Sequence, residues 1–121
     1  MKYETFDLFD DTQHCRMREL FDEDTYEAIM GERFASLKAK LAIARSHMRS
    51  HDKEALLKEL GAISYIAGMI GFAGVDRFAK SITRQLNNDN WERLLVALAS
   101  LDEVYEQSLA AWPGRTTAYQ D

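Results

Sequence analysis

Apolar side chains recur along the chain at steps of three and four residues, which is the period of an amphipathic helix. The longest such stretch covers about residues 25–50, and its apolar stripe consists of Met30, Phe34, Leu37, Leu41, Ala44 and Met48. Three further stretches follow at about 53–71, 75–86 and 90–112, and a shorter helical piece over 16–21 precedes them. No segment alternates with period two for long enough to favour a strand. The pattern predicts an all-α protein.

The later helices carry stripes of the same kind. Their members are Leu56, Leu60, Ile63, Ala67 and Ile70, then Val75, Phe78, Ile82 and Leu86, then Trp91, Leu94, Leu98, Leu101, Tyr105, Leu109 and Trp112. Asp52 is expected to cap one helix, and Asn87-Asn88-Asp89 to form a turn and the next cap. Amphipathic helices joined by short polar turns predict an antiparallel up-and-down four-helix bundle. We expect Leu41, Leu60, Ile63, Phe78, Ile82, Leu98 and Leu101 to be buried in its core.

Turn-forming residues set the expected domain limits. Pro113-Gly114 is a strong stop signal, so the bundle should end near Trp112. We therefore divide the chain into an N-terminal arm (1–15), a bundle (16–112) and a tail (113–121). Within the arm, Phe6, Leu8 and Phe9 stand among acidic residues. Folding back over the chain's own core is favoured for them over docking into a partner's groove.

Composition narrows the classes of function. The net charge of −5 argues against binding to nucleic acid or to an anionic membrane surface. No apolar run approaches the roughly 18 residues of a membrane span. The N-terminal sequence is acidic where a signal peptide is basic and then apolar. The single cysteine, Cys15, excludes an internal disulfide. These features favour a soluble, cytoplasmic protein without a cofactor.

Glycines interrupt the stretch L-G-A-I-S-Y-I-A-G-M-I-G-F-A-G, which spans residues 60–74. A glycine inside a helix costs roughly 0.5–1 kcal/mol relative to alanine, so several of them imply close approach by something. One explanation is tight helix packing in a bundle of no particular family, which would bury Gly61. A docking surface would instead leave Gly61 exposed.

The same stretch resembles the centre of the histidine phosphotransfer (HPt) domain, whose signature is approximately H-x-L-K-G-x-A-x-x-L-G. Ile63, Ala67, Gly68, Ile70 and Gly71 fall on matching positions. The resemblance extends over about residues 16–112, because HPt domains also have a short leading helix followed by four main helices. It implies a component of bacterial two-component, or phosphorelay, signal transduction.

The phosphoacceptor histidine of that family is absent. Two registers compete, one placing its slot on Gly61 and the other on Ser64, and the first is preferred because it keeps the family's distances to the flanking turns. In that register Ser64 replaces a lysine and Tyr65 replaces a small residue. Imidazole suits the transfer because it is nucleophilic while neutral and leaves readily once phosphorylated. The resemblance therefore implies a degenerate HPt domain that is not an enzyme.

The resemblance also indicates where a partner would dock. The expected partner-binding residues are Lys58, Gly61, Ser64, Tyr65 and Gly68, and the expected partner is a response-regulator receiver domain or a histidine kinase. The chain would act as a non-transferring adaptor or competitor. The alternative is a helical-bundle module for self-association or for interaction with a protein unrelated to phosphorelay.

Two other groups of residues carry possible chemistry. His47 and His51 have the i, i+4 spacing of a metal site, but solvated histidines near a helix end are favoured because the intervening glutamate of H-E-x-x-H is missing. His14 and Cys15 are adjacent potential ligands or catalytic groups. A surface thiol or a small core residue is favoured for Cys15, since a catalytic pair requires a third, orienting group.

Overall fold

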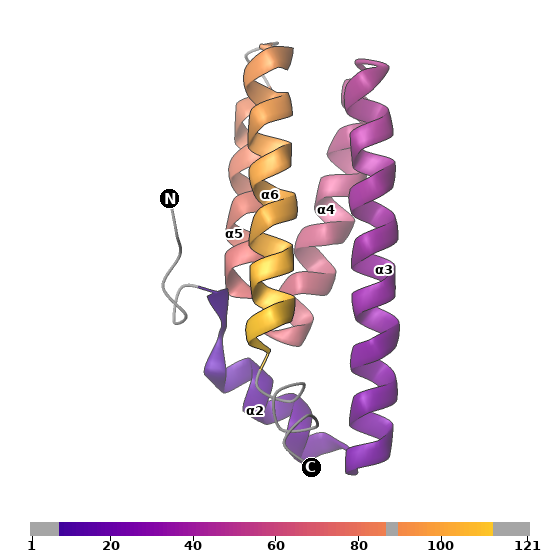
Figure 1. Ribbon diagram of the computed structural model, residues 1–121, viewed down its shortest axis with the longest axis vertical. Coiled ribbons are helices and arrows are strands. Elements are labelled where there is room, and N and C mark those ends of the chain that lie inside the picture. The colour runs from indigo at the N-terminus through magenta and orange to yellow at the C-terminus, as the bar shows by residue number, and fades with distance from the viewer. Residues whose placement is uncertain (1–7, 87–89, 113–121) are drawn as a thin grey trace.

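The computed structural model describes residues 8–86 and 90–112, and these residues form helices without any strand (Figure 1). The helices are α2 (Asp11–Leu20), α3 (Glu23–Arg49), α4 (Lys53–Ile70), α5 (Ala73–Gln85) and α6 (Trp91–Ala111). The prediction of an all-α protein is confirmed. None of the described helices combines the length and the apolar character that crossing a bilayer requires.

Helices α3 to α6 lie side by side along the long axis of the molecule (Figure 1). Helix α4 packs between α3 and α5, and α6 packs against both α5 and α3. Helix α2 crosses the end of this assembly at which α3 begins, and it contacts α3 and α4. The four long helices match the expected ranges closely. The predicted start of the leading helix is wrong, because α2 begins at Asp11 and not near residue 16.

Side-chain caps explain where the helices begin. The carboxylate of Asp10 accepts a hydrogen bond from the amide of Gln13 at 3.1 Å, which fixes the early start of α2. Asp22 caps α3 in the same way. Asp52 accepts from the amide of Ala55 at 3.1 Å, which confirms it as the cap of α4. The cap of α6 is Asn90 and not a residue of 87–89, so that prediction is wrong by at least one residue. The expected turn at 87–89 lies outside the described residues.

The predicted stripes form one continuous core. Of the residues expected inside it, Leu41, Leu60, Ile63, Ile82, Leu98 and Leu101 are buried. The predicted burial of Phe78 is wrong, because this side chain is only partly buried and packs against the rim of the core. The inward face of α5 is centred on Val75, Ala79 and Ile82, which leaves Phe78 at its edge. Phe34, Trp91 and Leu109 are partly buried in the same way.

The residues that precede α2 fold back onto the core. Leu8 and Phe9 are buried, and the ring of Phe9 meets the ring of Phe72 edge to face at 5.8 Å. The fold-back interpretation is thus confirmed for these two residues, while Phe6 lies outside the described residues. The division into arm, bundle and tail stays a prediction, and its first boundary falls inside α2.

Gly71 joins α4 to α5 and also receives α2. Its φ of 84° places it in the left-handed region that glycine adopts without a steric penalty. A Cβ there would stand 3.0 Å from the carbonyl oxygen of Asp10 and 3.3 Å from the amide nitrogen of His14. The carbonyl of Gly71 in turn accepts a hydrogen bond from the amide of Asp10 at 2.8 Å. The close approach that the glycines imply is therefore found here, and the approaching element is α2.

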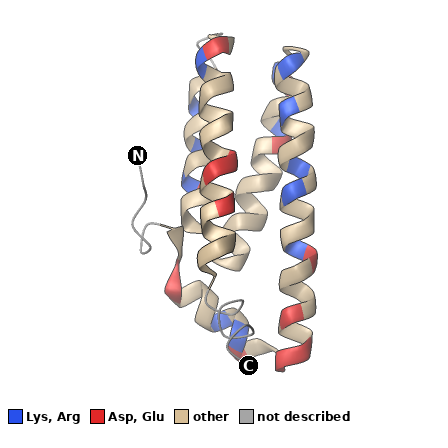
Figure 2. Cartoon of the chain, viewed as in Figure 1, with Lys and Arg blue, Asp and Glu red and all other residues tan. Residues whose placement is uncertain are grey.

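Charged side chains are distributed unevenly along α3 (Figure 2). Acidic residues gather in its first turns, and basic residues follow along the rest of its length. This order complements the helix dipole, which favours negative charge at the N-terminus and positive charge at the C-terminus.

Candidate functional site

An open hollow on the α4–α5 side of the molecule contains most of the predicted docking residues. Gly61, Ser64, Tyr65 and Gly68 all line it. Gly61 is exposed, with nothing within 4 Å of the position a Cβ would take, and Tyr65 is 73% exposed. The exposure of Gly61 argues against internal packing as the reason for this glycine. Lys58 is exposed on the same helix but does not line the hollow.

Four further residues line the hollow, and no sequence pattern indicates them as docking residues: Gln13, Met69, Asp76 and Lys80. Asp76 is the centre of their polar contacts. It accepts a hydrogen bond from the hydroxyl of Ser64 on α4, and the Lys80 ammonium nitrogen lies 3.3 Å from its Oδ1. The i, i+4 spacing of Asp76 and Lys80 is a detectable signal of their ion pair. Their position opposite Ser64 depends on the turn at Gly71, which the spacing does not specify.

The arrangement of α4 and α5 also explains Gly68. A Cβ on this glycine would come within 3.4 Å of Oδ2 of Asp76. The small residue therefore lets the Asp76 carboxylate lie against α4, where the Ser64 hydroxyl reaches it. Gly68 and Ser64 together place a negative charge at the floor of the hollow. The ammonium group of Lys80 offsets this charge in part, because it is 60% exposed and screened by water.

Helix α2 forms one edge of the hollow through Gln13. The side-chain amide of Gln13 donates a hydrogen bond to the carbonyl of Met69 at 2.8 Å. Met69 lies in the last turn of α4, where carbonyl groups lack partners within the helix. The contact therefore satisfies an end group of α4 and fixes α2 beside the docking residues.

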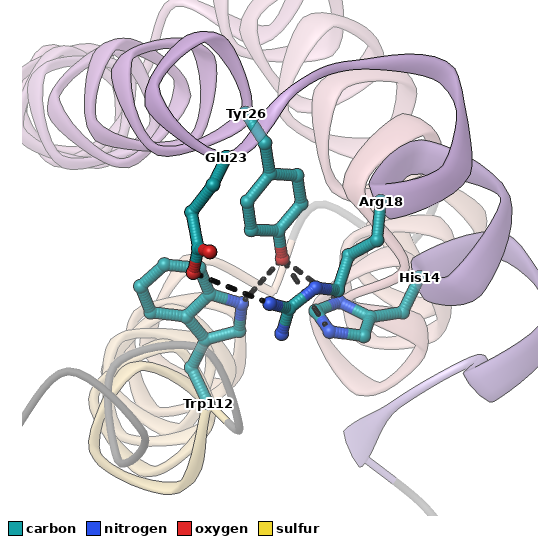
Figure 3. A network of polar contacts seen from close by, with 5 residues as sticks. All are labelled: His14, Arg18, Glu23, Tyr26 and Trp112. Carbon is teal, nitrogen blue, oxygen red and sulfur yellow. Dashed lines mark hydrogen bonds and ion pairs between the residues drawn. The ribbon is translucent and has the colours of Figure 1, made fainter. Parts of the chain in front are cut away.

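A second polar cluster holds α2 against α3 and the end of α6 (Figure 3). The ring nitrogens of His14 lie 3.4 Å from the hydroxyl of Tyr26 on α3, and that hydroxyl accepts a hydrogen bond from the indole of Trp112 at 3.3 Å. Arg18 lies over the ring of Tyr26, 5.1 Å from its centroid, and pairs with Glu23 at 3.6 Å. We call these five residues the Tyr26 cluster. It connects α2, α3 and the end of α6.

Burial sets the protonation behaviour of this cluster. Burial lowers the pKa of His14 from its ordinary value, and the charge of Arg18 lowers it further, while Asp11 acts in the opposite direction. Burial also raises the pKa of Tyr26. Both effects favour the neutral forms, so the cluster is held by hydrogen bonds between uncharged rings with Arg18 and Glu23 at its edge.

The remaining candidates do not form sites in the described part of the chain. Cys15 is exposed whereas His14 is buried, so of the two alternatives favoured for Cys15 the structure shows the surface thiol and not the small core residue. The imidazole of His51 stacks on the indole of Trp91, with centroids 4.5 Å apart and planes 3° apart. No three His, Cys, Asp or Glu side chains come together as a metal site within residues 8–86 and 90–112.

Comparisons of the chain with protein-family models, with curated proteins and with solved structures find no match.

Proposed function

We propose that this chain is an HPt-like component of two-component signal transduction in the bacterial cytoplasm, and that it binds a receiver domain or a histidine kinase without relaying phosphate. The observation that carries the proposal is the exposed α4 face at Gly61, where the resembling family has its phosphoacceptor. The open space at that position and the exposed Tyr65 are what a docking surface without an acceptor requires.

The order of the helices supports the finer fold that this proposal includes. Helices α3 to α6 contact one another in sequence and α6 returns to α3. Consecutive long helices linked by short turns are typical of an antiparallel up-and-down four-helix bundle. In the HPt-like interpretation α2 is the leading helix, and α4 is the helix whose outer face the partner contacts.

The local geometry favours the register that places the acceptor slot on Gly61. A side chain at Gly61 would extend into open space. The hydroxyl of Ser64 is instead half-buried and hydrogen-bonded to Asp76. A histidine at position 61 would meet a partner, whereas a side chain at position 64 is directed to α5.

The chemistry of the hollow supports binding without transfer. Its lining contains no histidine, and the carboxylate of Asp76 would repel an incoming phosphoryl group. The lysine slot on α4 is occupied by Ser64, and Lys80 supplies its charge from α5 while paired with Asp76. These features leave a surface that recognises a partner but offers no acceptor with the reversibility of phosphohistidine.

The test combines a transfer assay with a binding assay. Incubation with purified phosphorylated receivers should leave no acid-labile phosphate on His14, His47 or His51, while at least one receiver or kinase binds the chain. Stoichiometric labelling of a histidine would overturn the non-transferring role. Gly61→His alone should not restore efficient transfer, because position 64 still lacks the lysine.

Tyr65 offers a second readout of the same proposal. Aromatic anchors at interfaces cost at least about 2 kcal/mol of binding energy when they are truncated. Tyr65→Gly should weaken the cognate partner, and it should admit other receivers that clash with the ring. Unchanged affinity would reject this face. Self-association of the chain without receiver binding would favour the alternative of a module unrelated to phosphorelay.

A further inference from the structure

The outward face of α3 is lined by small side chains. They follow one another at steps of three and four residues, so they share one side of the helix, and all of them are exposed: Ala28, Gly31, Ala35, Ala39, Ala42 and Ser46. We call them the small-residue face. No described helix covers the side of α3 that faces away from α4 and α6 (Figure 1). Two helices approach each other closely where the side chains between them are small.

The charges of α3 indicate which molecule fits this face (Figure 2). Every carboxylate of the helix lies within residues 23–32, and every lysine and arginine lies within residues 33–49. The helix dipole acts mainly on the first and last turns, so it does not explain Glu32, Lys38 or Lys40 in the middle of the helix. A helix that is acidic in one half and basic in the other is complementary to a second copy of itself that runs in the opposite direction.

Ion pairs within the chain neutralise only part of these charges. Among the described residues, the ion pairs that involve α3 are Arg18–Glu23, Lys40–Glu59 and Arg45–Asp102. Asp24, Glu27 and Arg49 are exposed and belong to no ion pair within that part of the chain. Unpaired charges of opposite sign therefore stand at the two ends of the small-residue face.

An antiparallel pair of α3 helices brings these features into register. With a two-fold axis between residues 36 and 37, Asp24 stands level with Arg49 of the second copy, because both lie equally far from the axis along the helix. Gly31 stands level with Ala42 of the second copy for the same reason. The charged ends therefore attract each other, and the helices meet between these ends through small side chains.

We infer that the small-residue face of α3 is the interface of a homodimer in which the two α3 helices run antiparallel. The acidic end of each helix lies against the basic end of the other, and the small side chains allow close contact. The 27 residues of α3 provide about 40 Å of helix for this contact. Because small side chains bury little apolar surface, the dimer is weak, and its charged ends make it sensitive to salt.

Sedimentation equilibrium of the intact chain measures the dimer. The buffer contains a reductant, because the exposed Cys15 could otherwise link two chains. The average mass should rise from that of a monomer toward twice that value as the concentration increases from about 10 µM to about 1 mM. Raising the salt from about 50 mM to about 500 mM should weaken the dimer about 3–10-fold. A chain that stays monomeric at the highest concentration overturns the inference.

Charge reversal tests the antiparallel orientation. Asp24→Lys or Arg49→Glu alone should weaken the dimer about 5–30-fold, because the symmetry creates two repulsive contacts in each dimer. A mixture of the two variants should associate as tightly as the wild type, since each substituted side chain then meets one of opposite charge. Arg84→Glu is the matched control and should have no effect, because Arg84 is likewise an exposed cation in the last turn of its helix. Failure of the mixture to associate contradicts the inference.

Ala35→Gln tests the close contact of the two helices. Ala35 lies beside the axis, so the longer side chain enters the contact from both copies and should weaken the dimer at least about 10-fold. Ala99→Gln, at an exposed alanine of α6, is the matched control and should associate like the wild type. Thermal unfolding checks that both variants are folded. Equal association of the two variants rejects this face as the interface.

Lys38 provides a second control within α3. It lies beside the axis, in a groove that it shares with Glu106 of α6, so its charge is partly offset within its own chain. Lys38→Ala should therefore leave association unchanged, in contrast to Arg49→Glu at the end of the helix. A dimer that depends on Lys38 would contradict the register about residues 36 and 37.

The same variants separate this inference from the proposed function. The α4–α5 hollow is lined by residues of α2, α4 and α5, so a dimer formed through α3 leaves it open. Purified receiver domains that bind the wild type should bind Ala35→Gln equally well. A monomeric chain that binds receivers would leave the signalling role standing and reject the interface. A dimer that binds no receiver would do the reverse.

Discussion

Two tyrosines show how differently the two polar clusters of this molecule are used. Tyr26 is 2% exposed, and its hydroxyl is shared by His14 and Trp112 (Figure 3). Tyr65 is 73% exposed on the rim of the α4–α5 hollow. The Tyr26 cluster uses its polar groups to hold α2 against α3 and α6. The hollow leaves an aromatic ring and a bare glycine facing outward, so its capacity for contact remains available to another molecule.

The largest expected effect is the difference in stability between substitutions of these two tyrosines. Tyr26→Ala should destabilise the protein by about 3–5 kcal/mol, because it removes a buried ring and leaves His14 and Trp112 without their shared hydroxyl. Tyr65→Ala should change the free energy of unfolding by less than about 0.5 kcal/mol, as surface substitutions usually do. Denaturant unfolding of both variants makes the measurement. Similar losses in the free energy of unfolding at both positions would contradict the assignment of Tyr26 as a buried anchor and of Tyr65 as an exposed surface residue.

Truncation of side chains in the core beneath both clusters should strongly lower the free energy of unfolding. Leu41→Ala on α3 and Leu98→Ala on α6 should each cost about 2–5 kcal/mol through lost burial and the cavity left behind. Both side chains are nearly inaccessible to solvent, at 2% and 1% exposure. Losses below about 1 kcal/mol at both sites, measured by the same denaturant unfolding, would mean that these stripes do not face a shared core.

Gly61 inside α4 and Gly71 at its C-cap should respond to alanine with opposite signs, although the effects are smaller. Gly71→Ala should destabilise the protein by at least about 1–2 kcal/mol, because an L-residue at positive φ is strained and the new Cβ presses on α2. Gly61→Ala should stabilise it. Thermal unfolding of the pair checks the opposite signs, and an unchanged Tm for Gly71→Ala would place α2 elsewhere.

The smallest effect concerns the pH dependence of the Tyr26 cluster. The pKa of His14 is lowered in the folded protein, so the unfolded chain binds the proton more tightly. The contribution of neutral His14 to stability is therefore complete above about pH 6.5, the ordinary histidine value, and is lost as the pH falls below it. The free energy of unfolding, measured between pH 8 and 5, should decline less steeply in His14→Gln. Parallel curves for the two proteins would contradict this role.

The sequence predicts the helices well because their apolar stripes are local and periodic. The stripe of α4, from Leu56 to Ile70, is entirely buried. The same reasoning misplaces Phe78, because the core face of a short helix is narrow and its rim depends on how the neighbours tilt. It also begins the leading helix too late, since the mostly polar α2 buries only His14 and Met17 and offers little periodic signal.

The candidate site is predictable on α4 and not beyond it. Gly61, Ser64, Tyr65 and Gly68 are close in the sequence and share one helix face, so their spacing is sufficient to group them. Asp76 and Lys80 join them only because the left-handed turn at Gly71 folds α5 back against α4. Gln13 joins from a helix far away in the sequence. No local pattern specifies either event. The Tyr26 cluster is not predictable for the same reason, because its residues come from α2, α3 and the end of α6.

The amide of Asp10 donates a hydrogen bond to the carbonyl of Gly71, so hydrogen exchange of this one amide reports whether the whole of α2 is docked. Asp10 is the cap of α2, and its amide is protected from solvent exchange only while α2 lies on the turn after α4. Its deuterium uptake therefore measures how often α2 separates from the end of α4. Within α3 to α6, by contrast, exchange of the central amides follows opening of the core itself.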